Sequence, residues 1–336
     1  MNSKISRPFI IAELSGNHNG KIERAFKLLE AAKKAGANAA KLQTYTADTL
    51  TIDSNEPDFL ITQGPWAGYN LYKLYQEAHT PWNWHPELFS KAQELDIEIF
   101  SSPFDETAVD YLEKLGVARY KIASFEIVHL PLIKYAAQTK KPMIISTGMA
   151  NLEEISDAVE TAFNNGCTNL TLLHCVSSYP AVTKDCNLLT MIDIKKHFPD
   201  VAIGLSDHTL GTTVSVAAVA LGAEVIEKHI TLARSEGGVD AAFSLEPHEF
   251  KELCQEVYDS WLSLGTVNYC RAQSELENKV FRRSIYAVED IYPGERLTKK
   301  NIRIIRPGFG LEPKYFDEIV GTESKKTYKK GQRLYI

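Results

Sequence analysis

The sequence predicts an α/β fold: a (β/α)8 TIM barrel followed by a small, mainly β domain. Eight short runs rich in β-branched and apolar residues recur along the chain, and segments with the apolar spacing of helices separate them. Each run ends in a cluster of polar or charged residues. Because the active site of such a barrel lies at the carboxyl ends of its strands, we expect the chemistry of the protein in these clusters.

The expected strands and helices alternate along the first three quarters of the chain. The strands cover residues 9–14, 39–43, 97–102, 118–124, 142–147, 170–175, 202–207 and 225–230. The helices cover residues 22–35, 85–95, 105–115, 130–139, 152–165, 188–197, 211–221 and 248–262. Asp105 and Asn151 precede two of these helices, and their side chains are suited to cap them.

One connection is much longer than the others. Residues 44–84 follow the second expected strand and are rich in aromatic side chains, at Tyr45, Phe59, Trp66, Tyr69, Tyr72, Tyr75, Trp82 and Trp84. A long loop on the catalytic face of a barrel often covers the active site as a lid. An oligomer contact or additional packing would explain the same composition, and the sequence leaves these interpretations open.

The pattern changes after residue 263. We expect the barrel domain to cover residues 1–263, a polar linker to cover 264–279 and a second domain to cover 280–336. The last of these contains short β-type segments separated by PG, GFG and KGQ turns, and it is rich in Arg and Lys. A domain this small is marginally stable alone, so we expect it to dock on another surface.

Composition excludes several classes of function. The 336 residues carry a net charge of −6 with no basic block, which gives no support for nucleic-acid binding. The five cysteines are odd in number and show no CxxC spacing, which argues against a disulfide framework or a structural zinc site. No signal-peptide pattern or apolar run of about 18 residues occurs, so we expect a cytoplasmic protein without a membrane span.

Two histidines stand at the ends of the last two expected strands. His208 follows GLSD and His229 ends IEKH. Neighbouring strand ends lie close together in a closed barrel, so both imidazoles can hold one divalent metal with positions left for substrate. Asp207 and Glu227 flank them as possible supporting carboxylates. The alternative is that each imidazole only makes hydrogen bonds at the rim.

Two lysines lie inside otherwise apolar strands. Lys41 and Lys121 would be costly to bury without an anionic partner. That partner is either a carboxylate of the barrel, such as Glu13 or Glu126, or the phosphate or carboxylate of a ligand. Hydroxyl groups at neighbouring strand ends favour an anion pocket, and they belong to Ser102, Ser124, Ser146 and Thr147.

Other polar residues are candidates for proton transfer or for binding sugar hydroxyls. Glu13 ends the first strand, Glu126 follows the fourth, and Asp240 lies in a glycine-rich loop, where a surface role is more plausible than for Glu13 in its apolar strand. Tyr179 follows the sixth strand and can hydrogen-bond a polar substrate. Cys175 lies in the same region, but nothing near it in the sequence indicates the lowered pKa of a nucleophilic thiol.

The motifs, in their order, resemble the sialic acid synthase family, and the resemblance covers nearly the whole chain. The strings are IAELSGNHNG, KLQT, FSSPFD, YKIASFE, ISTGMA, LLHCVSSYP, GLSDHTLG and EKH, and RPGFGLEP resembles the antifreeze-like (SAF) domain of that family. Within the family the chain is most similar to the pseudaminic acid synthase branch, through KLQTYTADTL, FSSPFDETAVDYLE and DAAFSLEP.

The resemblance implies a condensation of phosphoenolpyruvate with an amino-sugar aldose. For the pseudaminic acid branch the sugar is 2,4-diacetamido-2,4,6-trideoxy-altrose, and the products are pseudaminic acid and phosphate. The alternatives are an N-acetylneuraminate synthase acting on N-acetylmannosamine and a legionaminate synthase acting on a 6-deoxy-diacetamido-mannose. The resemblance also implies a domain-swapped homodimer, in which Arg306 of one chain reaches the active site of its partner.

The resemblance further implies a role for each site residue. His208 and His229 would bind a divalent metal, with Mn²⁺ favoured and Mg²⁺ or Co²⁺ as alternatives. Phosphoenolpyruvate would be held by Lys41, Ser102, Lys121, Ser124 and Ser146. The sugar and the reacting atoms would be flanked by Glu13, Gln43, Glu126, Tyr179 and Asp240. Glu13, Glu126 and the two histidines would be the catalytic residues.

Two rival interpretations come from other classes. A lyase with the same fold would use one lysine to form an imine with its substrate, and two lysines beside many hydroxyls favour anion binding instead. A carbohydrate-sensing or ice-binding protein is suggested only by the C-terminal domain. Eight polar-ended strands disfavour that non-enzyme interpretation.

Overall fold

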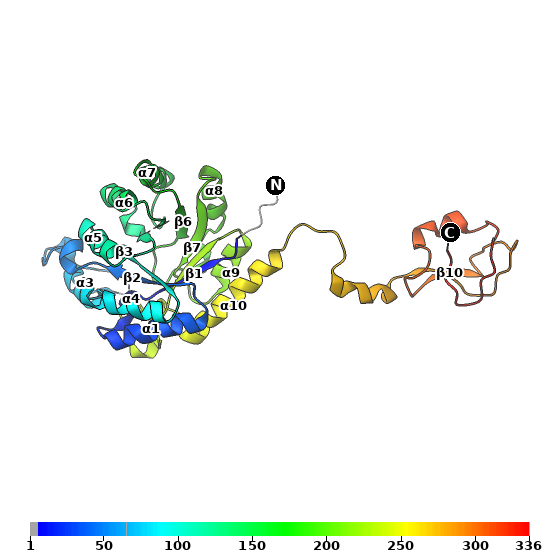
Figure 1. The fold of residues 1–336 in the computed structure, drawn as a ribbon, viewed down its shortest axis with the longest axis horizontal. Coiled ribbons are helices and arrows are strands. Elements are labelled where there is room, and N and C mark those ends of the chain that lie inside the picture. The colour runs from blue at the N-terminus through cyan, green and yellow to red at the C-terminus, as the bar shows by residue number, and fades with distance from the viewer. Residues whose placement is uncertain (1–5, 65, 336) are drawn as a thin grey trace. The chain divides into compact units, whose positions relative to one another are not determined.

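The computed structural model describes residues 6–64 and 66–335, and these divide into two units. The first unit ends at Thr266 and the second begins at Val267. In Figure 1 the first unit runs from blue to yellow and the second from orange to red. Each unit has its own hydrophobic core, so each is described by itself.

The first unit is a closed barrel of eight parallel strands that pair in sequence order, which confirms the predicted fold. The strands are β1 (Phe9–Glu13), β2 (Ala39–Thr44), β3 (Glu98–Pro103), β4 (Tyr120–Ile122), β5 (Met143–Ser146), β6 (Leu170–Cys175), β7 (Ala202–Asp207) and β8 (Val225–His229). Most of their residues are buried, because the strands are covered on one face by helices and on the other by the barrel interior.

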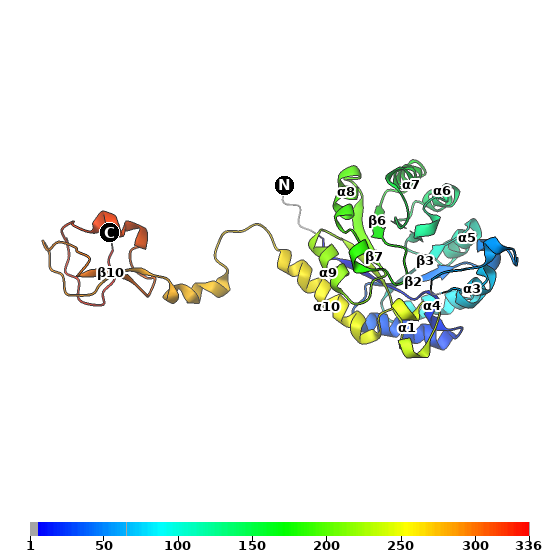
Figure 2. The same ribbon diagram turned by 180° about the vertical axis from the view of Figure 1, so that it is seen from behind.

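Helices surround the strands in both views (Figure 1, Figure 2). They are α1 (Ile22–Ala35), α4 (His85–Glu94), α5 (Glu106–Lys114), α6 (Leu130–Gln138), α7 (Leu152–Asn164), α8 (Leu189–His197), α9 (Thr213–Ala220) and α10 (Pro247–Leu264). α10 packs against both α9 and α1 and so closes the ring. No helix in the described ranges is long and apolar enough to span a membrane.

Local sequence explains where the helices begin and which face they bury. The Asp105 carboxylate accepts hydrogen bonds from two backbone amides at the start of α5, and Asn151 forms a capping box with Glu154 at the start of α7. Both predicted caps are therefore confirmed. In α7 the buried residues recur with a helical period, at Ile155, Ala158, Val159 and Ala162.

The long connection after β2 forms its own small helices. They are α2 (Ala47–Leu50), α3 (Leu71–Ala78) and two 3-10 turns at Pro57–Phe59 and Trp82–Trp84. The Asn70 side chain accepts hydrogen bonds from the backbone amides of Tyr72 and Lys73 and so caps α3. α2 packs against α3, so this segment is an ordered addition to the barrel.

The second unit has an antiparallel pair of strands, β9 (Ser284–Ala287) and β10 (Ile302–Ile305). A 3-10 helix at Gln273–Phe281 precedes them, and a 3-10 turn at Pro313–Tyr315 leads into the short α11 (Phe316–Ile319). Isolated β-bridges join most of the remaining turns. Its core is small, and it consists of Ile285, Ala287, Ile291, Leu297, Ile302, Tyr328 and Leu334.

Candidate active site

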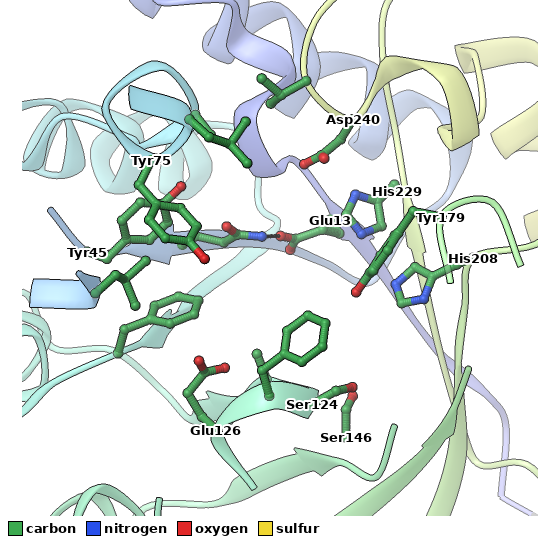
Figure 3. A pocket seen from close by; sticks show the side chains of 18 of the residues that line it. Glu13, Tyr45, Tyr75, Ser124, Glu126, Ser146, Tyr179, His208, His229 and Asp240 are labelled. Carbon is green, nitrogen blue, oxygen red and sulfur yellow. Dashed lines mark hydrogen bonds between the residues drawn. The ribbon is translucent and has the colours of Figure 1, made fainter. Parts of the chain in front are cut away.

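A cavity of about 360 Å³ opens at the carboxyl ends of the strands. It is lined by eleven of the thirteen residues to which the resemblance assigned a role: Glu13, Lys41, Gln43, Lys121, Ser124, Glu126, Ser146, Tyr179, His208, His229 and Asp240. Figure 3 shows many of them pointing into one space. The cavity is the place where a polar ligand would bind in this barrel.

Two of the expected site residues do not line the cavity. Ser102 is fully buried in β3, where its Oγ accepts a hydrogen bond from Lys41 Nζ at 3.3 Å. Arg306 belongs to the second unit, where its guanidinium lies 6.0 Å from the centre of the Phe281 ring. Ser102 can therefore act on a ligand only through Lys41.

The register of the parallel strands brings the charged residues together. Glu13 of β1 is paired with Lys41 of β2 on one side and with His229 of β8 on the other. On β7 and β8, Ser206 is paired with Glu227. Residues far apart in the sequence thus become neighbours, because paired residues of adjacent strands lie at the same height along the barrel axis.

Four buried charges lie at the base of the cavity. Lys41 Nζ lies 2.7 Å from Glu13 Oε2 and 3.7 Å from Glu227 Oε1, while Lys121 Nζ lies 3.3 Å from that same Glu227 oxygen. None of the four residues is more than 4% exposed. The sequence left open whether each lysine pairs with a barrel carboxylate such as Glu13 or Glu126. Lys41 does pair with Glu13, whereas the partner of Lys121 is Glu227 and not Glu126.

Burial and charge act in opposite directions on these groups. Burial raises the cost of charge on Glu227, but Lys121 and Lys41 outweigh it and hold the pKa of this carboxyl below its usual value. For Lys121 burial outweighs the attraction of Glu227, and the pKa of its amine is lowered. A further anion beside Lys121 would oppose this desolvation, so the base of the cavity favours an anionic ligand.

The supporting role expected for Asp207 is wrong. Its carboxylate forms an ion pair of 2.8 Å with buried Lys228 and accepts hydrogen bonds from Thr209 and Ser215. Within the described ranges neither Asp207 nor Glu227 hydrogen-bonds an imidazole of His208 or His229. The reason is that successive side chains alternate along a strand, so Asp207 faces away from the interior.

The two histidines lie side by side at the cavity, with ring centres 5.4 Å apart (Figure 3). His208 Nδ1 lies 3.0 Å from the carbonyl oxygen of Val176, so its Nδ1–H donates to that oxygen. Burial disfavours charge on this ring, but Cys175 and the Val176 carbonyl outweigh it and raise the pKa of His208. His229 Nδ1 is buried without a hydrogen-bond partner in the described structure. Burial holds the pKa of His229 well below its usual value, so its imidazole is neutral.

These two imidazoles fit a divalent metal held by few protein ligands. The described residues contain no group of three or more His, Cys, Asp or Glu side chains arranged around one metal position. A metal bound by two imidazoles would therefore leave further positions for water and substrate, as catalytic metal sites require. The unpartnered Nδ1 of His229 is the observation that favours this fit.

Other buried polar atoms at the cavity also lack partners among the described residues. They are Ser146 Oγ, Glu126 Oε2 and Glu227 Oε2. Buried polar groups are usually hydrogen-bonded, and leaving one unpaired costs about 1–3 kcal/mol. Their concentration at one cavity indicates that a polar ligand completes their hydrogen bonds.

Cys175 differs from what the sequence indicated. Its Sγ lies 3.7 Å from His208 Nδ1 and 3.4 Å from Ser124 Oγ. Burial opposes ionisation of the thiol, but these contacts outweigh it and lower the pKa of Cys175. The sequence showed no sign of a lowered pKa for the Cys175 thiol, and the expectation of an ordinary pKa was wrong. Cys175 is nevertheless buried and does not line the cavity, so it is not placed to attack a ligand.

Sequence reasoning left open whether the long connection after β2 covers the active site, and it missed the aliphatic side chains with which that connection lines the cavity. The apolar wall that it supplies consists of Tyr45, Leu50, Ile61, Trp66, Leu71, Leu74, Tyr75 and Ala78. Trp66 Nε1–H donates to the carbonyl oxygen of Val239 at 2.9 Å, and its ring lies 5.4 Å from that of Tyr179. This segment therefore covers the cavity. The helical spacing of Leu71, Leu74, Tyr75 and Ala78 is the signal that could have revealed it.

A TIM barrel with buried lysines, hydroxyls and paired imidazoles at its mouth defines a protein that binds an anionic substrate. The NeuB family model matches residues 28–269, and the SAF domain model matches residues 282–335. The chain belongs to the NeuB family, which confirms the resemblance found in its motifs.

Known proteins resemble the chain over nearly its whole length. It is 45% identical to a pseudaminic acid synthase of Helicobacter pylori, over 97% of this chain and 96% of that protein. It is 44% identical to a pseudaminic acid synthase of Campylobacter jejuni, over 97% and 95%. The crystal structure of an N-acetylneuraminic acid synthetase from Leptospira borgpetersenii, in complex with citrate, has a TM-score of 0.73 and 33% identity, covering 82% of this chain and 92% of that one.

Glu126 gives a testable consequence of burial. Burial raises the pKa of its carboxyl from 4.5 to about 7. Since the pKa of Glu126 is higher in the folded than in the unfolded protein, its carboxyl makes a contribution to the free energy of unfolding that depends on pH. This contribution is fully present below pH 4.5 and is lost as the pH rises through 7. Glu126→Gln lacks this loss, so its stability relative to wild type should grow by about 3 kcal/mol between pH 4.5 and 8.

Urea unfolding at pH 4.5 and pH 8, followed by tryptophan fluorescence, measures this difference. All four tryptophans (Trp66, Trp82, Trp84 and Trp261) belong to the first unit, so the signal reports on the barrel alone. Glu160→Gln, at an exposed position of α7, is the matched control and should show no such trend. An equal stability difference at both pH values would contradict the raised pKa.

Proposed function

We propose that this protein condenses phosphoenolpyruvate with 2,4-diacetamido-2,4,6-trideoxy-altrose to give pseudaminic acid and phosphate, in the cytoplasm. The observation that carries the proposal is the pairing of buried Lys41 and Lys121 beside His208 and His229 in one cavity. The match to pseudaminic acid synthases over 97% of the chain supports the choice of sugar.

Phosphoenolpyruvate would bind at the base of the cavity. Its phosphate and carboxylate would contact Lys41 and Lys121. Glu227 is the one ion-pair partner of Lys121 among the described residues, so this amine keeps donors for a ligand, whereas Lys41 already contacts Glu13, Ser102 and Glu227. Ser124 and Ser146 would donate hydroxyl hydrogen bonds, and the unpartnered Oγ of Ser146 supports this role. Ser102 would hold Lys41 in position from beneath, through the 3.3 Å contact.

The sugar would lie with its C1 aldehyde toward the histidines. Gln43, Tyr179 and Asp240 line the cavity around that position and can bind its hydroxyls. His208 and His229 would hold a divalent metal, which we propose to be Mn²⁺, with Mg²⁺ or Co²⁺ as alternatives. When bound there, the metal would polarise the aldehyde carbonyl.

The reaction forms a carbon–carbon bond and a carbon–oxygen bond to water, and it breaks the carbon–oxygen bond to phosphate. C3 of phosphoenolpyruvate attacks C1 of the aldehyde, water adds to C2, and loss of phosphate from C2 leaves a nine-carbon 2-keto acid. Both protons of the water leave its oxygen: in the overall balance one is gained by the former aldehyde oxygen and the other by the released phosphate. Burial raises the pKa of both Glu13 and Glu126 to about 7, so either carboxyl can exchange protons near neutral pH.

The sugar assignment is tested with the purified protein, phosphoenolpyruvate and Mn²⁺. We expect phosphate release to have the highest kcat/KM with the diacetamido altrose, at least about ten-fold above the diacetamido mannose isomer and N-acetylmannosamine. Preference for one of the other sugars would replace pseudaminic acid synthesis with legionaminate or N-acetylneuraminate synthesis. Trapping of a substrate adduct by borohydride would instead favour an imine-forming lyase.

The metal site is tested by binding as well as by turnover. His208→Ala and His229→Ala should each weaken Mn²⁺ binding at least about 100-fold, because each removes one of two imidazole ligands. Isothermal titration calorimetry measures this directly, and phosphate release should fall in parallel. His248→Ala, at an exposed histidine of α10, is the control. Unchanged Mn²⁺ affinity in both variants would refute the two-histidine site.

We further propose that two chains form a domain-swapped homodimer. Exposed apolar side chains follow four consecutive strands on the cavity side of the barrel, at Phe125, Val128, Met149, Leu152, Val182, Leu189 and Leu210. A cluster of this kind favours a protein contact. Arg306 is exposed and forms no ion pair with any residue in the described ranges, so its charge is available for a substrate in the partner chain.

Mixed dimers test the swap. Arg306→Ala should reduce kcat/KM about 100-fold or more if its guanidinium binds substrate, while Arg303→Ala on β10 should have little effect. Mixing inactive Arg306→Ala and Lys41→Ala chains should restore activity, because half of the mixed dimer's sites combine two intact halves. Light scattering should give a dimer. A monomer, or no recovery on mixing, would contradict the swap.

A further inference from the structure

One side of the cavity is apolar and is built from the connection after β2. α3 directs Leu71, Leu74, Tyr75 and Ala78 toward the cavity, at positions i, i+3, i+4 and i+7 of one helix face. The opposite face of α3 carries exposed Lys73, Gln76 and Glu77. α3 is thus an amphipathic helix whose apolar face meets the ligand space.

Aromatic side chains extend this apolar surface across the cavity. The Tyr45 ring lies 5.8 Å from that of Tyr75 and 5.1 Å from that of Phe104, both edge-on. In Figure 3, Tyr45 and Tyr75 lie on the far side of Glu13 from His208 and His229. The cavity therefore has a charged end at the histidines and an apolar end at α3.

We propose that the apolar face of α3, with Tyr45 and Phe104, binds the methyl groups of the sugar and selects a 6-deoxy, N-acylated sugar over one with a C6 hydroxyl. The inference rests on the proposed function, which places the aldehyde C1 at the histidines. The chain of the sugar then carries its far end toward α3. A C6 methyl and the acetyl methyls would be buried against Leu71 and Leu74, whereas a C6 hydroxyl directed at these aliphatic side chains would lose water without gaining a partner from them.

The few polar groups at this end match an acylated amine. Glu126 lies beside Phe125 in the cavity wall, and its Oε2 is buried without a partner among the described residues. An amide N–H of the substrate can donate to this oxygen while its acetyl methyl packs on the apolar face. A hydrophobic pocket discriminates against an analogue that carries an added hydroxyl by about 100-fold.

Leu71→Asn tests the inference, because Leu71 is only partly buried and its replacement is similar in size. We expect kcat/KM for the 6-deoxy-diacetamido sugar to fall at least about ten-fold. The ratio of kcat/KM for this sugar to kcat/KM for the same sugar with a C6 hydroxyl should fall by a similar factor. The KM for phosphoenolpyruvate should stay within about two-fold of the wild-type value. Lys73→Asn, on the exposed face of the same helix, should change none of these values.

The outcomes separate this inference from the proposed function. No phosphate release with any sugar in the wild type would refute the proposed function itself. Phosphate release with an unchanged sugar preference in Leu71→Asn would refute only the role of α3. Circular dichroism confirms folding, and Ile61→Asn, in the loop before α3, replaces Leu71→Asn if that variant does not fold.

Discussion

The cluster of Lys41, Lys121, Glu13 and Glu227 is the constraint on which the rest of the site depends. Each buried ion costs several kcal/mol to remove from water, and pairing offsets this only when the geometry is close. The short contact is Lys41 to Glu13 at 2.7 Å, whereas Glu227 is shared between two lysines at 3.3 and 3.7 Å. The cluster is thus stable enough to keep both lysines buried, and loose enough to accept an anion between them.

The barrel maintains this cluster because its strand register fixes the level of every side chain. Glu13 is held between Lys41 and His229 by backbone pairing on both sides, so the buried lysines and the two histidines of the charged end meet at one residue. A slip of one residue would turn each side chain to the opposite face of its strand. Fold and site therefore cannot vary independently here, and the proposed carbon–carbon bond would form between the lysines and the histidines.

Local patterns predicted the strands and the two caps, since each depends on residues near one another in the sequence. The positions of polar residues at strand ends also predicted most of the cavity lining, because the strand ends of a barrel share one face. β4 is shorter than expected and ends at Ile122, because Ser124–Glu126 form a 3-10 turn that brings Glu126 to the cavity. Pairing between distant residues was not predictable in this way. Lys121 and Glu227 are 106 positions apart, and only the closed barrel makes them partners.

The two ends of the cavity come from different parts of the architecture. Strand ends supply the charged end, whose positions are fixed by the hydrogen-bonded barrel. The connection after β2 supplies most of the apolar end, and it is anchored by contacts such as Trp66 to Val239 instead of by the sheet. A substitution in α3 can therefore change which sugar fits without moving Lys41 or His229. Recognition of the sugar's methyl groups by α3, as proposed, would be separable from the chemistry, because α3 lies outside the strands whose register positions Lys41 and His229.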